Sequence, residues 1–222
     1  FFGWKKLKTK KPLGHLLRAF SSVGCVVCYF FGLKYLMLSE NVAIVHSAPI
    51  IATFLAVPIL GEKIGLHRIT AVILGFIGVL IIVKPGSEFF KIESLFPLAA
   101  AFFMAGTYLA TRFLMSTESS IAIIFYYSVA LLLTSLVFFP NNFIIPNLID
   151  LIPLLGLGVM GSFGHYFMAQ AAKSAEVVVI TPFEYTSFIF LGFMGYFFYN
   201  EIPSFSVFIG AAFIVLSGIY IV

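Results

Sequence analysis

Eight apolar stretches, each about the length needed to cross a lipid bilayer, follow one another along this chain. A helix needs about 20 apolar residues to span the hydrocarbon core. Lipid offers no hydrogen bonds to backbone groups, so such stretches fold as helices. We therefore predict an all-α polytopic membrane protein with eight transmembrane helices. The predicted spans cover residues 13–38, 42–60, 66–83, 94–113, 119–139, 149–171, 177–199 and 205–222.

Charged residues make up only 10% of the chain, against about 25% in soluble domains, so no separate soluble domain is expected. The net charge of +4 could suggest a nucleic-acid partner, but the basic residues stand at span ends and report topology instead. One side carries Lys5, Lys6, Lys8, Lys10, Lys11, Arg18, Lys63, Arg68, Arg112 and Lys173, and the other carries Lys34, Lys84 and Lys91. The positive-inside rule predicts that the first side is cytoplasmic. Arg18 and Lys34 lie near the ends of the first span, where long side chains are expected to reach the interface.

An internal repeat relates the two halves of the chain at an offset of 137 to 140 residues. Residues 56–62 correspond to 196–201, and 75–79 correspond to 215–219. The copies are five helices apart, an odd number, so they are expected to cross the membrane in opposite directions. Inverted repeats of this kind are typical of secondary transporters, whose solute site lies near the midplane between the repeats.

The most informative single stretch is Thr181-Pro182-Phe183-Glu184-Tyr185, inside the predicted span 177–199. A carboxylate at membrane depth is costly, so Glu184 is a functional-site candidate. On a helix Thr181, Glu184 and Ser187 share one face. Pro182 breaks the backbone ladder there, which is tolerated where a helix lines a cavity or packs on protein. Two readings stay open: the wall of a solute pathway, or a carboxylate that caps a freed backbone group.

His46 falls opposite Tyr185 when the repeat offset is applied, so His46 and Glu184 are expected at similar depths on two helices that meet. Thr53 follows two turns later on the same face as His46. His46 either lines the cavity or is a neutral imidazole bonded to a carbonyl that Pro49 frees.

His165 and Tyr166 lie on the predicted helix that precedes Glu184. His165 either reaches the cavity or makes a packing hydrogen bond. Gly158 and Gly161 give the same helix a small-residue face, which predicts close contact with another helix. Small pairs at Gly75/Gly78 and Gly192/Gly195 are read as packing sites. Further aromatic candidates are Tyr108, Tyr126 and Tyr127.

The repeats, the Leu60-Gly61-Glu62 step and the stretches around Thr117 and Pro182 resemble the EamA-domain proteins of the drug/metabolite transporter superfamily. The second copy departs from the step with Asn200-Glu201. The resemblance implies ten helices in two inverted five-helix repeats, and a cavity lined by the third and fourth helices of each repeat. On this reading residues 1–86 hold the last three helices of the first repeat, and residues 94–222 form a complete second repeat. Phe1 stands where Met is usual, so two leading helices are expected before it.

The resemblance also implies a bacterial inner-membrane carrier of a small organic metabolite, such as S-adenosylmethionine or riboflavin. The residues expected to bind the solute are Glu184, Tyr185, Thr181, His46, Thr53, His165 and Tyr166. Expected partners are the solute, the lipid bilayer and a coupling proton, with no nucleic acid. The alternatives are a passive channel and a membrane-embedded enzyme. No G-x-x-x-x-G-K-[ST] loop, G-x-S-x-G elbow or H-E-x-x-H motif occurs, so the sequence predicts no enzyme, no cofactor and no metal site.

Overall fold

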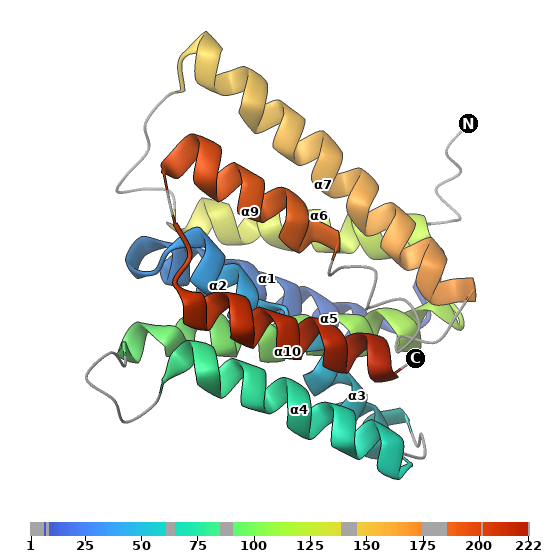
Figure 1. The fold of residues 1–222 in the computed structure, drawn as a ribbon. Helices are drawn as coiled ribbons and strands as arrows, with labels where there is room; N and C mark the ends of the chain where they lie inside the picture. The colour runs from blue at the N-terminus through green and yellow to red at the C-terminus, as the bar shows by residue number, and fades with distance from the viewer. Residues whose placement is uncertain are drawn as a thin grey trace.

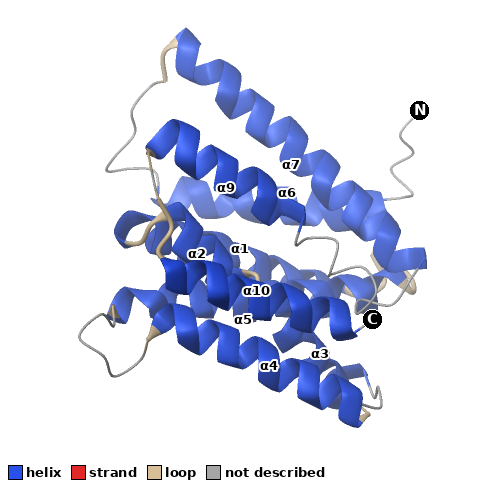
Figure 2. Cartoon of the chain, viewed as in Figure 1, coloured by secondary structure: helices blue, strands red, loops and turns tan. Residues whose placement is uncertain are grey.

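The computed structural model describes residues 7, 9–60, 65–84, 91–138, 146–174, 186–200 and 202–221. All regular structure in this part of the chain is helical (Figure 2). In chain order the helices are α1 (Pro12–Tyr35), α2 (Leu38–Val45), α3 (Ala48–Leu60), α4 (Leu66–Val83), the 3₁₀ turn η2 (Ile92–Ser94), α5 (Leu95–Met115), α6 (Ser120–Phe138), α7 (Leu148–Ser174), α9 (Thr186–Tyr199) and α10 (Phe205–Ile221).

Many of these helices are apolar on the outside as well as in the core. Leu148 and Phe205, for example, are each about four-fifths exposed, which suits contact with lipid tails. Within the described residues, five stretches are long and apolar enough to cross a membrane: Pro12–Tyr35, Leu38–Ile59, Ile92–Met115, Ser120–Val137 and Leu148–Ser174. Two shorter apolar helices cover Ile69–Val83 and Phe205–Tyr220. The prediction of an all-α polytopic membrane protein is confirmed.

The second predicted span, residues 42–60, is two helices rather than one. The break lies at His46 and Ser47, between α2 and α3. Pro49 is the second residue of α3, a position where its missing N–H removes no intrahelical bond. Ser47 closes the break, because its hydroxyl donates to the carbonyl of Ile44 over 2.7 Å. The His46 side chain therefore stands at the end of a helix rather than on a continuous helical face.

Two long helix pairs form the centre of the bundle: α1 packs along α5, and α4 packs along α10 (Figure 1). The second pair approaches closely at Gly78 and Gly210, where a Cβ on either glycine would lie 2.6 Å from the carbonyl oxygen of the other. The two helices run antiparallel, since the ring of His67 at the start of α4 contacts Tyr220 near the end of α10. The packing role predicted for Gly78 is confirmed.

Helix α7 lies at the edge of the bundle (Figure 1) and is exposed along most of its length. Close helix contact was expected at Gly158 and Gly161, but no described atom lies within 4 Å of a Cβ placed on either residue. That prediction is wrong for the arrangement described here. The contact of α7 with the bundle is made further along, where Ala169 and Ala172 pack against Leu114.

Several helix ends that carry the predicted cytoplasmic charges lie close together. At the end of α5, the Arg112 guanidinium donates to the carbonyl of Ala172 in the last turn of α7 over 2.7 Å. The segment before α1 meets the turn between α5 and α6, where the Lys10 amide donates to Glu118. We call this side of the molecule the basic end.

Candidate functional site

Three of the predicted solute-binding residues, Thr181, Glu184 and Tyr185, lie outside the described residues. The description resumes at Thr186, the first residue of α9. Ser187, which the sequence places on the same helical face as Glu184, is therefore the nearest described indicator of where this face points.

Ser187 meets His46 at a junction between α9 and the break that follows α2. The Ser187 hydroxyl oxygen lies 2.7 Å from Nε2 of His46, and Nδ1 of His46 lies 2.9 Å from the carbonyl oxygen of Val42. A carbonyl can only accept, so Nδ1 carries the proton. In the neutral imidazole Nε2 is then the acceptor, and the Ser187 hydroxyl donates to it. The imidazole thus joins the end of α2 to the start of α9.

This geometry refines the two readings of His46. The ring is bonded to a backbone carbonyl, as the packing reading required, but the acceptor is Val42 within α2 rather than a carbonyl freed by Pro49. At the same time the ring is half-buried and faces the helix that follows Glu184. His46 therefore lies at the predicted meeting of the two helices.

We predict a measurable coupling between His46 and Ser187. In a double-mutant cycle of His46→Ala and Ser187→Ala, the unfolding free energies should deviate from additivity by about 0.6 kcal/mol, the average for hydrogen bonds between membrane helices. Pairing His46→Ala with Ser135→Ala is the matched control, because the Ser135 hydroxyl donates within its own helix to Leu132. Additivity of the first pair to within about 0.3 kcal/mol would contradict the junction.

Thr53 is buried within α3, next to the helix face that packs on α5. Its hydroxyl donates to the carbonyl of Pro49, one turn earlier in the same helix, over 2.9 Å. Such a bond is common for a threonine inside a helix, because its hydroxyl readily bonds the carbonyl four residues before it. In this arrangement the Thr53 hydroxyl makes its hydrogen bond within its own helix.

His165 takes part in a row of side chains that crosses from α7 through α6 to α1. Its ring meets the Tyr127 ring edge-on, with the centroids 4.4 Å apart. On α1, the Arg18 guanidinium carbon lies 5.2 Å from the centroid of the same tyrosine ring. The row joins three helices, α7, α6 and α1, and it includes one predicted site residue and one aromatic candidate.

The expectation that Arg18 snorkels to the membrane interface is wrong. Its side chain is buried, with 2% of its surface exposed. Nε donates to the Thr111 hydroxyl over 2.9 Å, and one terminal nitrogen donates to the carbonyl of Ile123 at 3.4 Å. The residue lies on the face of α1 that packs on α5 and α6, so its side chain points into the bundle.

Tyr166 borders an open groove of about 900 Å³ between α6 and α7. The groove is mostly apolar, with Ser128 and Ser162 among its few polar lining residues. The Tyr166 hydroxyl accepts a hydrogen bond from the Gln170 amide at 3.4 Å, and the Gln170 carbonyl oxygen accepts from Ser120 on α6 at 2.8 Å. His165 and Tyr166 are adjacent in sequence but contact different neighbours, Tyr127 and Gln170 respectively.

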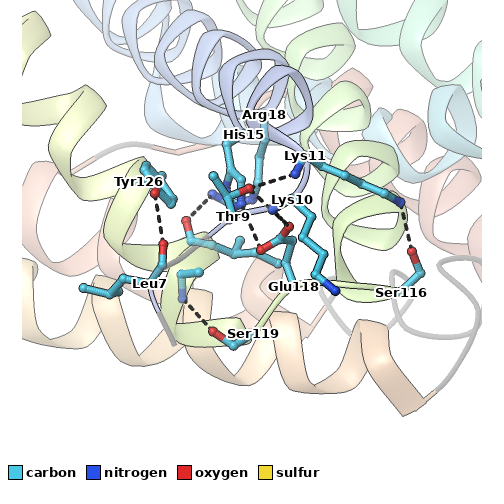
Figure 3. Close-up of polar contacts among 12 residues, drawn as sticks. Leu7, Thr9, Lys10, Lys11, His15, Arg18, Ser116, Glu118, Ser119 and Tyr126 are labelled. Carbon is cyan, nitrogen blue, oxygen red and sulfur yellow. Dashed lines mark hydrogen bonds and ion pairs between the residues drawn. The ribbon is translucent and has the colours of Figure 1, made fainter. Parts of the chain in front are cut away.

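A cluster that sequence reasoning missed surrounds Glu118, in the turn between α5 and α6 at the basic end (Figure 3). One carboxylate oxygen accepts from the Thr9 hydroxyl at 3.1 Å and from the Lys10 amide at 2.7 Å. The other lies 3.7 Å from Nε2 of His15 on α1. Glu118 thus clamps the segment before α1 onto the α5–α6 turn.

Burial of Glu118 acts to raise the pKa of its carboxyl, but the Lys10 and Thr9 hydrogen bonds together with the nearby His15 outweigh burial and hold that pKa below its ordinary value of 4.5. A carboxyl with a lowered folded-state pKa stabilises the fold above its unfolded-state pKa. That contribution is lost as the pH falls through the folded-state value.

Glu118→Gln should therefore lower the unfolding free energy by about 1 kcal/mol at pH 7, because charged hydrogen bonds become neutral ones. The loss should shrink as the pH falls through the lowered folded-state pKa of Glu118, because the native carboxyl then also becomes neutral. Thermal unfolding at several pH values measures this. The matched control is Glu40→Gln, which removes a partly exposed ion pair with Lys91 and should cost less. An equal loss at pH 7 and at pH 3.5 would contradict the clamp.

Comparison with known proteins shows to which family the chain belongs. The EamA-like transporter family matches residues 1–84 and 91–222. This chain belongs to that family. It is a small-metabolite transporter of the bacterial inner membrane rather than an enzyme, as the sequence predicted.

Characterised relatives of this transporter carry several solutes. It is 28% identical to an S-adenosylmethionine uptake transporter of Rickettsia bellii, over the whole of this chain and 76% of the relative. It is 29% identical to a riboflavin transporter of Vibrio cholerae, over 98% of this chain and 74% of the relative. A pseudopaline exporter of Pseudomonas aeruginosa is 26% identical over 92% of this chain and 72% of the relative.

A solved crystal structure supports the fold. It covers 97% of the transporter described here and 80% of its own chain, with a TM-score of 0.66 at 16% sequence identity. At that identity the likeness speaks for the fold alone.

Proposed function

We propose that this transporter carries a cationic or flat aromatic metabolite by alternating access, with S-adenosylmethionine as the first candidate and riboflavin as the second. Relatives named for these two solutes match at least 98% of the chain. Both solutes present a flat heterocycle, for which tyrosine and phenylalanine faces are suitable partners, and the sulfonium of S-adenosylmethionine also suits a carboxylate or an aromatic face.

The observation that supports this most is the junction of His46 with Ser187. It joins two helices that the internal repeat relates, beside the segment that holds Glu184. In secondary transporters the solute site lies at such an interface, and one repeat moves against the other around it. The antiparallel contact of α4 with α10, the last helices of the two halves, agrees with inverted repeats.

Glu184 has two proposed roles at this interface. It is the counter-ion for a cationic solute, or it takes up the proton that couples transport to the proton gradient. If solute and proton compete for the same carboxylate, the transporter exchanges one for the other. Each role explains why a carboxylate stands at membrane depth, where an apolar side chain would have a lower free energy.

Uptake by purified protein in proteoliposomes tests the proposal. Labelled S-adenosylmethionine and labelled riboflavin are offered separately, with and without a pH difference across the membrane. We expect saturable uptake of one of the two, and uptake accelerated by unlabelled solute inside. Absence of uptake for both would reject the proposed substrates.

A passive channel is the alternative mechanism, although the groove beside Tyr166 is mostly apolar and opens to the outside of the bundle. A channel conducts through a continuous pore lined by repeated polar groups. It shows neither saturation nor acceleration by solute on the far side. The same proteoliposome measurement therefore separates the two mechanisms.

A further inference from the structure

The buried guanidinium of Arg18 has no role in a site where a carboxylate binds a cationic solute. Arginine stays protonated in proteins, and a charge at membrane depth is retained where a function or a partner requires it. Within the described part of the chain, the ion pairs are His15 with Glu118 and Lys91 with Glu40. Neither includes Arg18, so no described carboxylate balances its charge.

The hydrogen bonds of Arg18 use only part of its capacity. A guanidinium has five N–H donors in a planar fork, and described acceptors engage two nitrogens, through Thr111 and Ile123. The two acceptors come from different helices, α5 and α6, and together they fix the orientation of the fork. Such a fork matches the two oxygens of a carboxylate, and this pairing is short and directional.

The depth of Arg18 also fits a solute site. At about 1.5 Å per residue, Arg18 lies about 9 Å from the start of α1. Tyr127 lies about 10 Å from the start of α6, and His165 about 14 Å from the end of α7. These helix ends all belong to the basic end, from which Glu184 is expected at about 12 Å. Arg18, Tyr127 and His165 therefore lie at similar depths, close to the depth expected for Glu184.

We infer that Arg18, oriented by Thr111 and flanked by Tyr127, binds a carboxylate of the transported solute. The inference rests on the proposed function and narrows the substrate class to those cationic or aromatic metabolites that also carry a carboxylate. S-adenosylmethionine has this chemistry, and riboflavin lacks a carboxylate.

The test compares S-adenosylmethionine with its decarboxylated analogue, which keeps the sulfonium and the adenosyl group. Wild-type protein in proteoliposomes should take up the carboxylate-bearing probe at least about tenfold better. Arg18→Gln should lose that preference: uptake of S-adenosylmethionine falls about tenfold or more, whereas uptake of the analogue stays within about threefold. Arg18→Lys should be intermediate, because an ammonium keeps the charge without the fork.

Two further variants separate binding from folding. Lys34→Gln is the matched control, because it removes an exposed positive charge from the same helix, and it should leave uptake of both probes unchanged. Arg18→Met replaces the buried charge by an apolar chain of similar size, a change that is often neutral or stabilising. Its melting temperature should be no lower than that of wild type, while its probe preference should be lost.

The possible failures are distinct. Equal loss of both probes in Arg18→Gln, or a melting temperature of Arg18→Met well below wild type, would show that Arg18 is structural and overturn the inference alone. If wild-type protein neither transports nor is thermally stabilised by either probe, the proposed substrate is wrong, and the carboxylate site is rejected with it.

Discussion

Glu184→Gln is expected to reduce solute uptake in proteoliposomes by at least about tenfold, the cost of removing one charged contact from a buried site. The amide has nearly the same shape as the carboxylate but carries no charge and takes up no proton. If Glu184 is the counter-ion, the apparent affinity for the cationic solute falls. If it carries the coupling proton, the dependence of uptake on external pH disappears.

The two roles of Glu184 are separated by solute counterflow, which needs no proton gradient. A counter-ion is required in both directions, so Glu184→Gln should then be slow in counterflow as well as in net uptake. A residue that serves only proton coupling should leave counterflow intact. Glu40→Gln is the matched control, because Glu40 pairs with Lys91 outside the proposed site. We expect this variant to show wild-type rates of uptake and counterflow. Wild-type uptake with a wild-type pH profile in Glu184→Gln would reject both roles.

The helical architecture could be predicted because it depends on a local property of the sequence. Each apolar stretch can satisfy its backbone only as a helix, whatever its neighbours are. The break at His46 and Ser47 was not predicted, although Pro49 was noted. A proline is compatible both with a bent continuous span and with the start of a new helix. The outcome depended on Ser47, whose hydroxyl and carbonyl close the break.

The position of side chains around a helix was harder to predict than the helix itself. Arg18 lies near a span end, and from sequence alone a snorkelling side chain is the reasonable expectation. The Arg18 side chain points inward because its partners are Thr111, Ile123 and Tyr127, about a hundred residues away. Glu118 was missed for the same reason, since its donors come from Thr9 and Lys10.

His46 shows what a repeat adds to sequence analysis. Its hydropathy and its neighbours did not distinguish a packing histidine from a site residue. The offset of the internal repeat, however, placed it opposite the Glu184 segment, and the structure brings it to Ser187, 141 residues away. Repeats carry information on long-range contact that local patterns lack. The positions of Thr181, Glu184 and Tyr185 remain predictions of the same argument.

Gly78→Ala should destabilise the transporter strongly. The new Cβ would lie 2.6 Å from the carbonyl oxygen of Gly210 and 2.9 Å from side-chain carbons of Phe213 and Ile214. The first contact is with backbone, so the whole of α4 or α10 has to shift. Overpacking of this kind costs about 1–3 kcal/mol or more, which should appear as a lower melting temperature in detergent.

The matched control is Gly164→Ala on α7, where no described atom lies within 4 Å of the new Cβ. Alanine is favoured over glycine inside a helix by about 1 kcal/mol, so this variant should be as stable as wild type or more so. The same chemical change is thus expected to act with opposite sign on two helices. If both variants shift the melting temperature equally, glycine conformational freedom rather than the α4–α10 contact governs the effect. If instead Gly78→Ala and Gly210→Ala are both destabilised and Gly164→Ala is not, the close approach of α4 and α10 at these glycines stabilises the fold.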